Sequence, residues 1–267
     1  MPNFVCVTCG IQYAGSEQPP EHCVICEDER QYVGWEGQRW TTLDELGAKH
    51  RLVFREEEAG LHSIVSEPAF AIGQRAHLVR SGHGNVLWDC IAPLTADALE
   101  TIRSLGGVRA IAISHPHYYT TMIEWSRALD APVYLHEADR KWVVREDGDL
   151  RFWKGETYAL FGGMTLIRSG GHFAGYQVLH WAAGVSGQGA LLAGDQPQVC
   201  YDSRWVTFLY SYPNMIPLGP SAIRGILASL EPFAFERIYG AFGRHVLSDA
   251  KGVVQRSAER YLRFIKC

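Results

Sequence analysis

The chain has 267 residues, of which 47% are hydrophobic, and a formal net charge of -4 at pH 7. This length allows one large core with a small appendage, and the acidic balance argues against nucleic acid or an anionic membrane as a partner. The sequence has no apolar run long enough to span a membrane and does not begin like a signal peptide. We therefore expect a cytoplasmic protein whose seven cysteines are thiols or metal ligands rather than disulfides.

Two C-x-x-C motifs stand near the N-terminus, Cys6 with Cys9 and Cys23 with Cys26, and thirteen residues separate them. Each motif presents two sulfurs from a tight turn, and two such turns complete a tetrahedral site that suits zinc, although iron also fits four thiolates. A pair of disulfides is the alternative. A segment this short cannot bury enough core to fold alone, so a metal would stabilise it. The pattern resembles a zinc ribbon or a rubredoxin-like knuckle, and it predicts a small domain at 1–34 that caps a larger one at 35–267.

Strands and helices alternate along the larger domain. A capping box opens the first helix, short apolar runs mark the strands, and glycine-containing turns separate them. The predicted helices are 42–47, 95–105, 118–129, 221–230 and 248–265, and the predicted strands are 61–65, 69–72, 76–80, 85–90, 108–113, 132–135, 165–167, 177–181, 190–193 and 237–240.

Side chains that commonly ligate metals follow several of these strands. They are His115, His117, His172, Asp195 and His245, with Asp89 at the end of an earlier strand. Each has a simpler explanation when taken alone, such as a helix cap or a surface pair. Imidazoles and carboxylates together form nitrogen and oxygen metal sites. Because strand ends can meet at one rim of a sheet, we expect these residues to build one site from distant parts of the chain.

Residues from about 60 to 265 resemble the metallo-β-lactamase superfamily. That family has a strand-to-turn motif H-x-H-x-D-H, a later His after a glycine-rich turn, an Asp after an apolar strand and a glycine, and a final His. Here the matching residues are His115 and His117, His172 after Gly170-Gly171, Asp195 after Gly194, and His245, while Asp89 matches an Asp that supports the ligands. The resemblance implies an α/β fold, a four-layer αββα sandwich, and most members of the family are hydrolases.

The sequence departs from the family at the centre of the motif. The second-metal Asp and His of the family fall on Tyr119 and Thr120, which are poor zinc ligands. By resemblance, the three remaining motif histidines hold the first metal, with Asp195 as fourth ligand or bridge. The second site would keep only Asp195 and His245. We therefore expect one active-site ion, zinc or iron, and no organic cofactor.

The residues left in the site suggest roles in hydrolysis. Asp195 would ligate the metal or orient water, Tyr119 would donate a hydrogen bond to a developing oxyanion, and His245 would protonate a leaving group. Alternatively, Tyr118 and Tyr119 fill the vacated second-metal pocket. Candidate substrate contacts, which would otherwise belong to the core or the surface, are Phe173, Tyr176, Trp205, Phe208, Tyr210, Tyr212, Arg168 and Arg204.

The expected function is metal-dependent hydrolysis of a small organic ester or thioester, with a small molecule as partner. The oligomeric state is left open. A non-catalytic binding or sensing protein on the same fold is the alternative. Nucleic-acid processing, which a ribbon joined to this fold suggests, is disfavoured by the acidic net charge.

Overall fold

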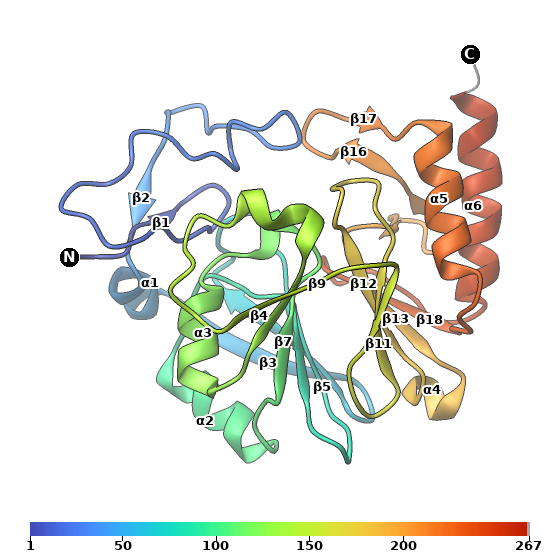
Figure 1. Cartoon of the computed structure of the whole chain (residues 1–267), viewed down its shortest axis with the longest axis horizontal. Helices are drawn as coiled ribbons and strands as arrows, with labels where there is room; N and C mark the ends of the chain where they lie inside the picture. The colour runs from blue at the N-terminus through green and yellow to red at the C-terminus, as the bar shows by residue number, and fades with distance from the viewer. Residues whose placement is uncertain (266–267) are drawn as a thin grey trace. The chain divides into compact units, whose positions relative to one another are not determined.

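The computed structural model describes residues 1–265 and divides the chain into two compact units (Figure 1). Unit 1 consists of Met1–Leu135 and Asp139–Phe152, and unit 2 consists of His136–Ala138 and the chain from Trp153 onward. The predicted ribbon belongs to unit 1. None of the helices in the described part of the chain has the length and hydropathy needed to cross a membrane.

Unit 1 is built on a mixed seven-stranded sheet with the order β3-β4-β5-β6-β7-β8-β9. Strands β6, β7 and β8 run parallel, so their carboxyl ends share one edge, and the pairs from β3 to β6 are antiparallel. The strands are β1 (Val5–Cys6), β2 (Trp40–Thr41), β3 (Arg51–Glu58), β4 (Leu61–Glu67), β5 (Ala76–Val79), β6 (Val86–Trp88), β7 (Ala110–Ala112), β8 (Val133–His136) and β9 (Leu150–Trp153).

Helices connect these strands, and their ends follow capping rules. The Thr42 side chain accepts a hydrogen bond from Glu45 N, and Thr95 accepts one from Ala98 N, as N-cap residues do. Helix α2 packs against β3 and buries Ile102. The helical segments are α1 (Leu43–Lys49), α2 (Ala96–Ser104), η1 (Pro116–Tyr118), α3 (Met122–Leu129) and η2 (Glu137–Trp142).

Unit 2 contains a second mixed sheet, of six strands in the order β10-β11-β12-β13-β18-β19, in which only β13 and β18 pair in parallel. Helices α5 and α6 pack on each other and against β11 and β18, respectively. The elements are β10 (Thr157–Ala159), β11 (Met164–Arg168), β12 (Gln177–Trp181), α4 (Gly184–Gly187), β13 (Ala190–Gly194), β14 (Gln198–Val199), β15 (Val206–Thr207), β16 (Leu209–Ser211), β17 (Ile216–Pro217), α5 (Pro220–Leu230), β18 (Arg237–Gly240), β19 (His245–Val246) and α6 (Ala250–Phe264).

Two predicted elements differ from the structure. The strand expected at 69–72 is a turn, because Ala71 has a left-handed backbone with φ 53° and Gly73 N bonds Phe70 O. The helix expected from 118 begins at Met122, since the residues before it form a short 3-10 turn that starts at Pro116. This extra turn carries one of the two histidines of the H-x-H motif.

A buried histidine in unit 2 should make the free energy of unfolding depend on pH. His180 on β12 is buried and its Nε2 lies 2.7 Å from Ala234 O, and burial lowers its pKa below the ordinary value. Below pH about 6.5 the unfolded chain therefore binds this proton more readily than the folded chain does. The free energy of unfolding should fall as the pH drops from 7 to 5, and His180→Gln should reduce that slope. Urea titrations at several pH values test this, and equal slopes in both proteins would contradict it.

Candidate metal centres

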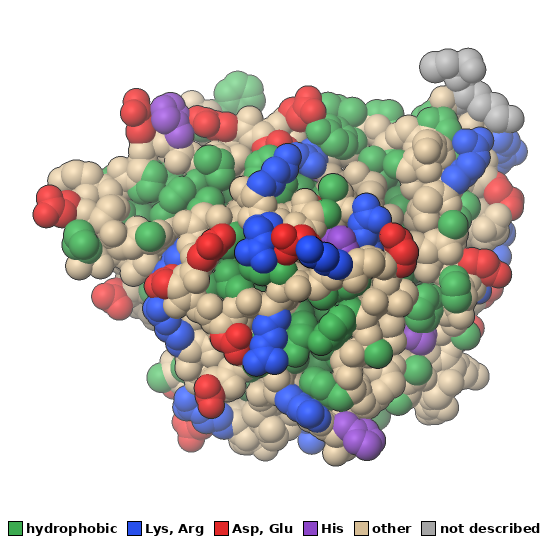
Figure 2. All heavy atoms as spheres, in the orientation of Figure 1, with side chains coloured by type: hydrophobic (Ala, Val, Ile, Leu, Met, Phe, Trp, Pro, Cys, Tyr) green, Lys and Arg blue, Asp and Glu red, His purple; other side chains and the backbone are tan. Residues whose placement is uncertain are grey.

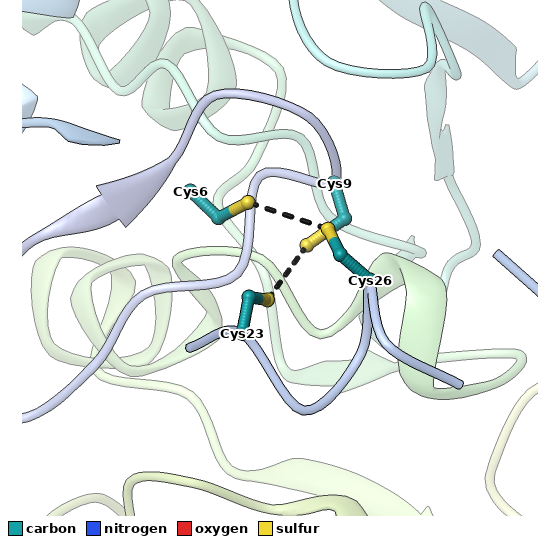
Figure 3. Close-up of side chains that lie close together, drawn as sticks. All are labelled: Cys6, Cys9, Cys23 and Cys26. Carbon is teal, nitrogen blue, oxygen red and sulfur yellow. Dashed lines mark hydrogen bonds between the residues drawn. The ribbon is translucent and has the colours of Figure 1, made fainter. Parts of the chain in front are cut away.

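The four N-terminal cysteines converge on one point (Figure 3). The sulfur of Cys6 lies 3.5 Å from that of Cys26, the sulfur of Cys9 lies 3.6 Å from that of Cys23, and all four lie within 4.8 Å of one another. A tetrahedral zinc with sulfurs at about 2.3 Å separates neighbouring sulfurs by about 3.8 Å, whereas a disulfide needs about 2.05 Å. The spacing fits a metal site with four cysteine ligands and argues against the disulfide alternative.

The surroundings of this four-cysteine cluster favour a bound cation. All four cysteines are buried, and Gln38 Nε2 donates a hydrogen bond to Cys6 Sγ at 3.1 Å. A hydrogen bond with Cys23 lowers the pKa of Cys6, while burial raises the pKa of Cys9. Several thiolates cannot share a buried space unless a cation compensates their charge. His22, which is adjacent to Cys23 in the sequence, is exposed, and its Nδ1 lies 2.6 Å from Glu27 Oε1.

The ribbon packs directly on the turn that carries the H-x-H motif. Gln12 N donates to Thr120 O at 3.1 Å, and a Cβ added to Gly10 would stand 3.3 Å from the Thr120 methyl group. Arg145, whose side chain is 4% exposed, bonds both Gln12 Oε1 and Glu124 Oε1 at 2.5 Å. The ribbon is thus anchored on the residues that follow His117, which supports the expectation that it caps the larger domain.

Unit 1 supplies two histidines from the end of β7. Asp89 Oδ1 accepts a hydrogen bond from Ser114 N at 2.7 Å and so holds the start of the turn. Ser114 Oγ lies 2.9 Å from Nδ1 of His115, which orients that ring, so Nε2 is the nitrogen that would ligate a metal. The His115 and His117 ring centroids are 4.9 Å apart, and both residues are buried.

Substitutions of Asp89 test how this turn is held. Because its carboxylate accepts the Ser114 N–H, Asp89→Ala should disturb the turn that presents His115 and weaken binding of the active-site metal about 10 to 100-fold. Asp89→Asn keeps an oxygen acceptor and should weaken metal binding less. Metal competition titration of both variants measures this. Equal losses would mean that the charge of Asp89, rather than its hydrogen bond to the turn, supports the site.

The two residues in place of the family's second-metal ligands are buried as well. Tyr119 is 2% exposed and Thr120 is 3% exposed. Together with Ile11 and Gln12 of the ribbon they line a small cavity of about 10 Å³. Burial, with a smaller effect of Asp139, raises the pKa of the Tyr119 hydroxyl well above its usual range, so that hydroxyl stays protonated. The ribbon and these two side chains fill the space on this side of the turn.

Unit 2 supplies a histidine from the glycine-rich turn after β11. Gln196 Oε1 accepts a hydrogen bond from His172 N at 3.0 Å, and Gln196 Nε2 donates to Gly170 O at 2.6 Å. A Cβ at Gly171, where φ is +85°, would stand 2.5 Å from the same amide nitrogen. Gly171 is therefore required for the amide to bond the backbone on both sides of this glycine, at Gly170 and His172.

The carboxylate of unit 2 is positioned by a tyrosine that sequence reasoning assigned only to substrate contact or core. Tyr176 Oη lies 2.6 Å from Ala193 O and 3.1 Å from Asp195 Oδ1, which share its single hydrogen, and it accepts hydrogen bonds from the N–H groups of Asp195 and Gln196. Tyr212 donates to Asp195 O, and its ring centroid is 5.5 Å from that of His172. Both tyrosines therefore hold the turn that presents Asp195.

Tyr176→Phe isolates the role of this hydroxyl group. The variant keeps the ring but removes the group that touches Asp195 at both its backbone and its carboxylate. We expect the affinity for the active-site metal to fall about 10 to 100-fold, as when groups that orient ligands are lost. Metal competition titration measures this, with Tyr158→Phe on β10 as a control for an exposed tyrosine. An unchanged affinity would show that the backbone alone positions Asp195.

His245 is not in the group formed by His115, His117, His172 and Asp195. It is half-buried on β19, and its ring centroid is 5.0 Å from that of Tyr239. Among the residues 1–265, two groups of side chains have the composition and geometry of a metal site, Cys6, Cys9, Cys23 and Cys26, and His115, His117, His172 and Asp195. His245 is in neither group, so its predicted role as a ligand or acid stays a prediction.

Several candidate substrate contacts have structural partners. Arg168 pairs with Glu156 and donates to Ala174 O, and Arg204 pairs with Asp202 on the surface. Phe208 is fully buried. These residues are explained by packing and ion pairing within unit 2. A hollow of about 660 Å³ beside Gly170 and Gly171 is lined by small residues of α5, by residues of β10 and β11 and by the segment after α5, and contains none of the candidate ligands.

Comparison with known proteins gives one curated relative and many structural neighbours, while no family model matches. The chain is 49% identical over 265 residues to the uncharacterized protein YmaE of Bacillus subtilis (strain 168), covering 98% of this chain and 97% of that protein. The crystal structure of VMB-1 superposes with a TM-score of 0.61 at 14% identity, over 81% of this chain and 99% of that one.

Two metallo-β-lactamases have similar TM-scores, identities and coverage. The DIM-1 enzyme has a TM-score of 0.57 at 14% identity, over 80% of this chain and 98% of that one. The FIM-1 enzyme of Pseudomonas aeruginosa, in its mono-zinc form, has a TM-score of 0.57 at 14% identity, over 78% of this chain and 95% of that one. These likenesses confirm the predicted α/β sandwich with two mixed sheets. The chain therefore has the metallo-β-lactamase fold and belongs to the family of YmaE.

Proposed function

We propose that this protein is a metal-dependent hydrolase of a small organic ester or thioester, and that it works with a single active-site ion. The observation that carries the proposal is the donor set of three histidines and one aspartate, His115, His117, His172 and Asp195. The site fits a zinc or iron ion, because three imidazoles and a carboxylate are typical ligands for both and each of the four residues is buried.

A single ion is favoured over two by what surrounds the H-x-H turn. Tyr119 and Thr120 replace the carboxylate and imidazole of a second site, and the ribbon packs against both of them. Asp195 and His245 alone would hold a second divalent ion weakly. The FIM-1 enzyme, which shares the fold, has been crystallised in a mono-zinc form, so the fold itself is compatible with one ion.

A bound ion of this kind lowers the pKa of a water molecule toward neutrality and polarises a substrate carbonyl. The chain's own residues would hold the geometry for this chemistry. Ser114 orients His115, Tyr176 orients Asp195, and Gln196 holds the backbone of His172. Asp195 would accept a proton from the attacking water or ligate the ion, and His245 would be the proton donor to a leaving group.

Hydrolysis of a small panel of aryl esters and acyl thioesters tests the proposal. The metal-loaded protein should turn over at least one member of the panel, and His117→Ala should abolish that activity. His83→Ala is the matched control, because His83 is exposed on the turn after β5. A protein that binds the ion but hydrolyses nothing would favour the alternative, a non-catalytic binding or sensing protein, which the filled space behind Tyr119 also supports.

A nucleic-acid substrate has less support. Figure 2 shows acidic and basic side chains interspersed over the face in view. Within the ribbon, Arg30 pairs with Asp28, and Arg39, which follows it, pairs with Glu36. Neither arginine offers an uncompensated charge to a phosphate backbone, so we do not assign the ribbon to nucleic-acid binding.

A further inference from the structure

A hollow of about 590 Å³ opens on the surface of unit 2, between α5, α6 and the segment before β15. It is lined by Trp205, Arg224, Arg256, Glu259, Leu262 and Arg263. None of these residues belongs to either candidate metal centre. The hollow is therefore not part of either metal centre, and the proposed hydrolase activity does not use it.

The basic side chains of α6 around this hollow share one face of the helix. Arg256, Arg260 and Arg263 stand at positions i, i+4 and i+7, and like charges at such spacings destabilise a helix by mutual repulsion. Figure 2 shows basic side chains gathered at the end of α6 that leads to the C-terminus. The repulsion along this stripe of Arg256, Arg260 and Arg263 would be reduced by a bound anion.

The stripe is only partly compensated by the protein. Arg256 pairs with Asp249 at 2.7 Å, and Glu259 accepts a hydrogen bond from Gln255. Within residues 1–265, no acidic side chain lies within ion-pair distance of Arg224, Arg260 or Arg263. Arg260 is near enough to Asp202 to help lower the pKa of that carboxyl, but Asp202 forms its ion pair with Arg204. The three guanidinium groups at or beside the hollow are thus not held in close ion pairs in this part of the chain.

One of these guanidinium groups is already held in place. The Arg260 guanidinium carbon lies 3.7 Å from the centroid of a Trp205 ring, a stacking distance. Stacking leaves the edge of the guanidinium, where its N–H groups are, available for hydrogen bonds. Trp205 and Leu262 in addition give the hollow an apolar wall beside its charged groups. The lining therefore combines anion donors with a surface for an organic moiety.

We propose that this hollow binds a small organic polyphosphate of about the size of a nucleoside diphosphate. Guanidinium groups bind phosphate oxygens in a bidentate way, and three of them match a ligand with more than one phosphate. The volume is in the range of small-molecule sites, about 300–1,000 Å³, and larger than a single phosphate needs. Arg224, Arg260 and Arg263 bind the phosphates, and Trp205 and Leu262 contact the organic part.

Isothermal titration of the full chain with ADP, inorganic pyrophosphate and adenosine in magnesium-free buffer tests this. ADP and pyrophosphate should bind and adenosine should not. The double variant Arg260→Gln with Arg263→Gln should weaken ADP binding at least tenfold, and Arg224→Gln, on a different helix, should weaken it in the same direction. Arg151→Gln, which removes an exposed arginine of unit 1, should change it less than twofold.

Some other outcomes would identify which part of the ligand is recognised, and others would overturn the proposal. Pyrophosphate that binds as tightly as ADP identifies the phosphates alone as the recognised group. Binding must persist in His117→Ala, since ADP that binds the active-site ion instead would lose affinity there and overturn the assignment. Unchanged affinity in the double variant, when thermal unfolding shows it is folded, would also overturn it. If the double variant does not fold, unchanged affinity in Arg224→Gln decides against the proposal. A short RNA that binds more tightly than ADP would make this surface a nucleic-acid site instead.

Discussion

Replacement of Cys23 by serine is expected to release the ribbon metal and to loosen the ribbon at 1–34, while the rest of the chain stays folded. The effect is large because a structural zinc contributes about 10 to 16 kcal/mol to the folding of small knuckles. The buried sulfurs of Cys6, Cys9 and Cys26 would be left with incomplete ligation. Limited proteolysis with mass spectrometry should find new cleavage sites that are confined to this segment.

Cys200→Ser is the matched control for this experiment. Cys200 is half-buried and belongs to neither candidate metal group. The contacts of Gln12 and Gly10 with Thr120 add a second expectation, that the active-site metal affinity of Cys23→Ser falls as well, though less than the ribbon affinity. If Cys23→Ser and the wild type were equally protected from proteolysis, a metal would not be what holds the ribbon together.

Replacement of His117 by alanine is expected to abolish the active-site ion and leave the ribbon metal in place. His117 contributes one of only four donors in its group, and an ion held by the remaining three loses a strong nitrogen ligand. The metal content should fall from two ions per chain to one. Elemental analysis after dialysis measures this, with His83→Ala as the control. A content of two ions in His117→Ala would contradict the assigned donor set.

Much of the candidate site was predictable because its residues follow simple local rules. Cysteine spacing predicted the four-cysteine cluster, and the positions of His115, His172 and Asp195 after strands predicted the second donor set. Both signals are short in sequence and depend on residue type. Strand β3, in contrast, was missed, because its run RLVFREEE has charged residues at both ends and its three apolar residues are consecutive rather than alternating with polar ones.

The positioning residues could not be predicted in the same way. Gln196 acts on the His172 turn across 24 residues, and Arg145 reaches Gln12 across 133 residues. No spacing rule links such pairs, because the contact is set by how the strands pack and not by the local chain. The docking of the ribbon on Thr120 is likewise a tertiary contact that composition and periodicity do not encode.

Anomalous scattering at the zinc and iron absorption edges from crystals of the full chain would count the bound ions and locate their ligands. We expect two peaks per chain, one at the sulfurs of the four-cysteine cluster and one ligated by His115, His117, His172 and Asp195. A single peak at the cysteines would contradict the proposed active-site ion. A third peak ligated by Asp195 and His245 would contradict the single-ion site.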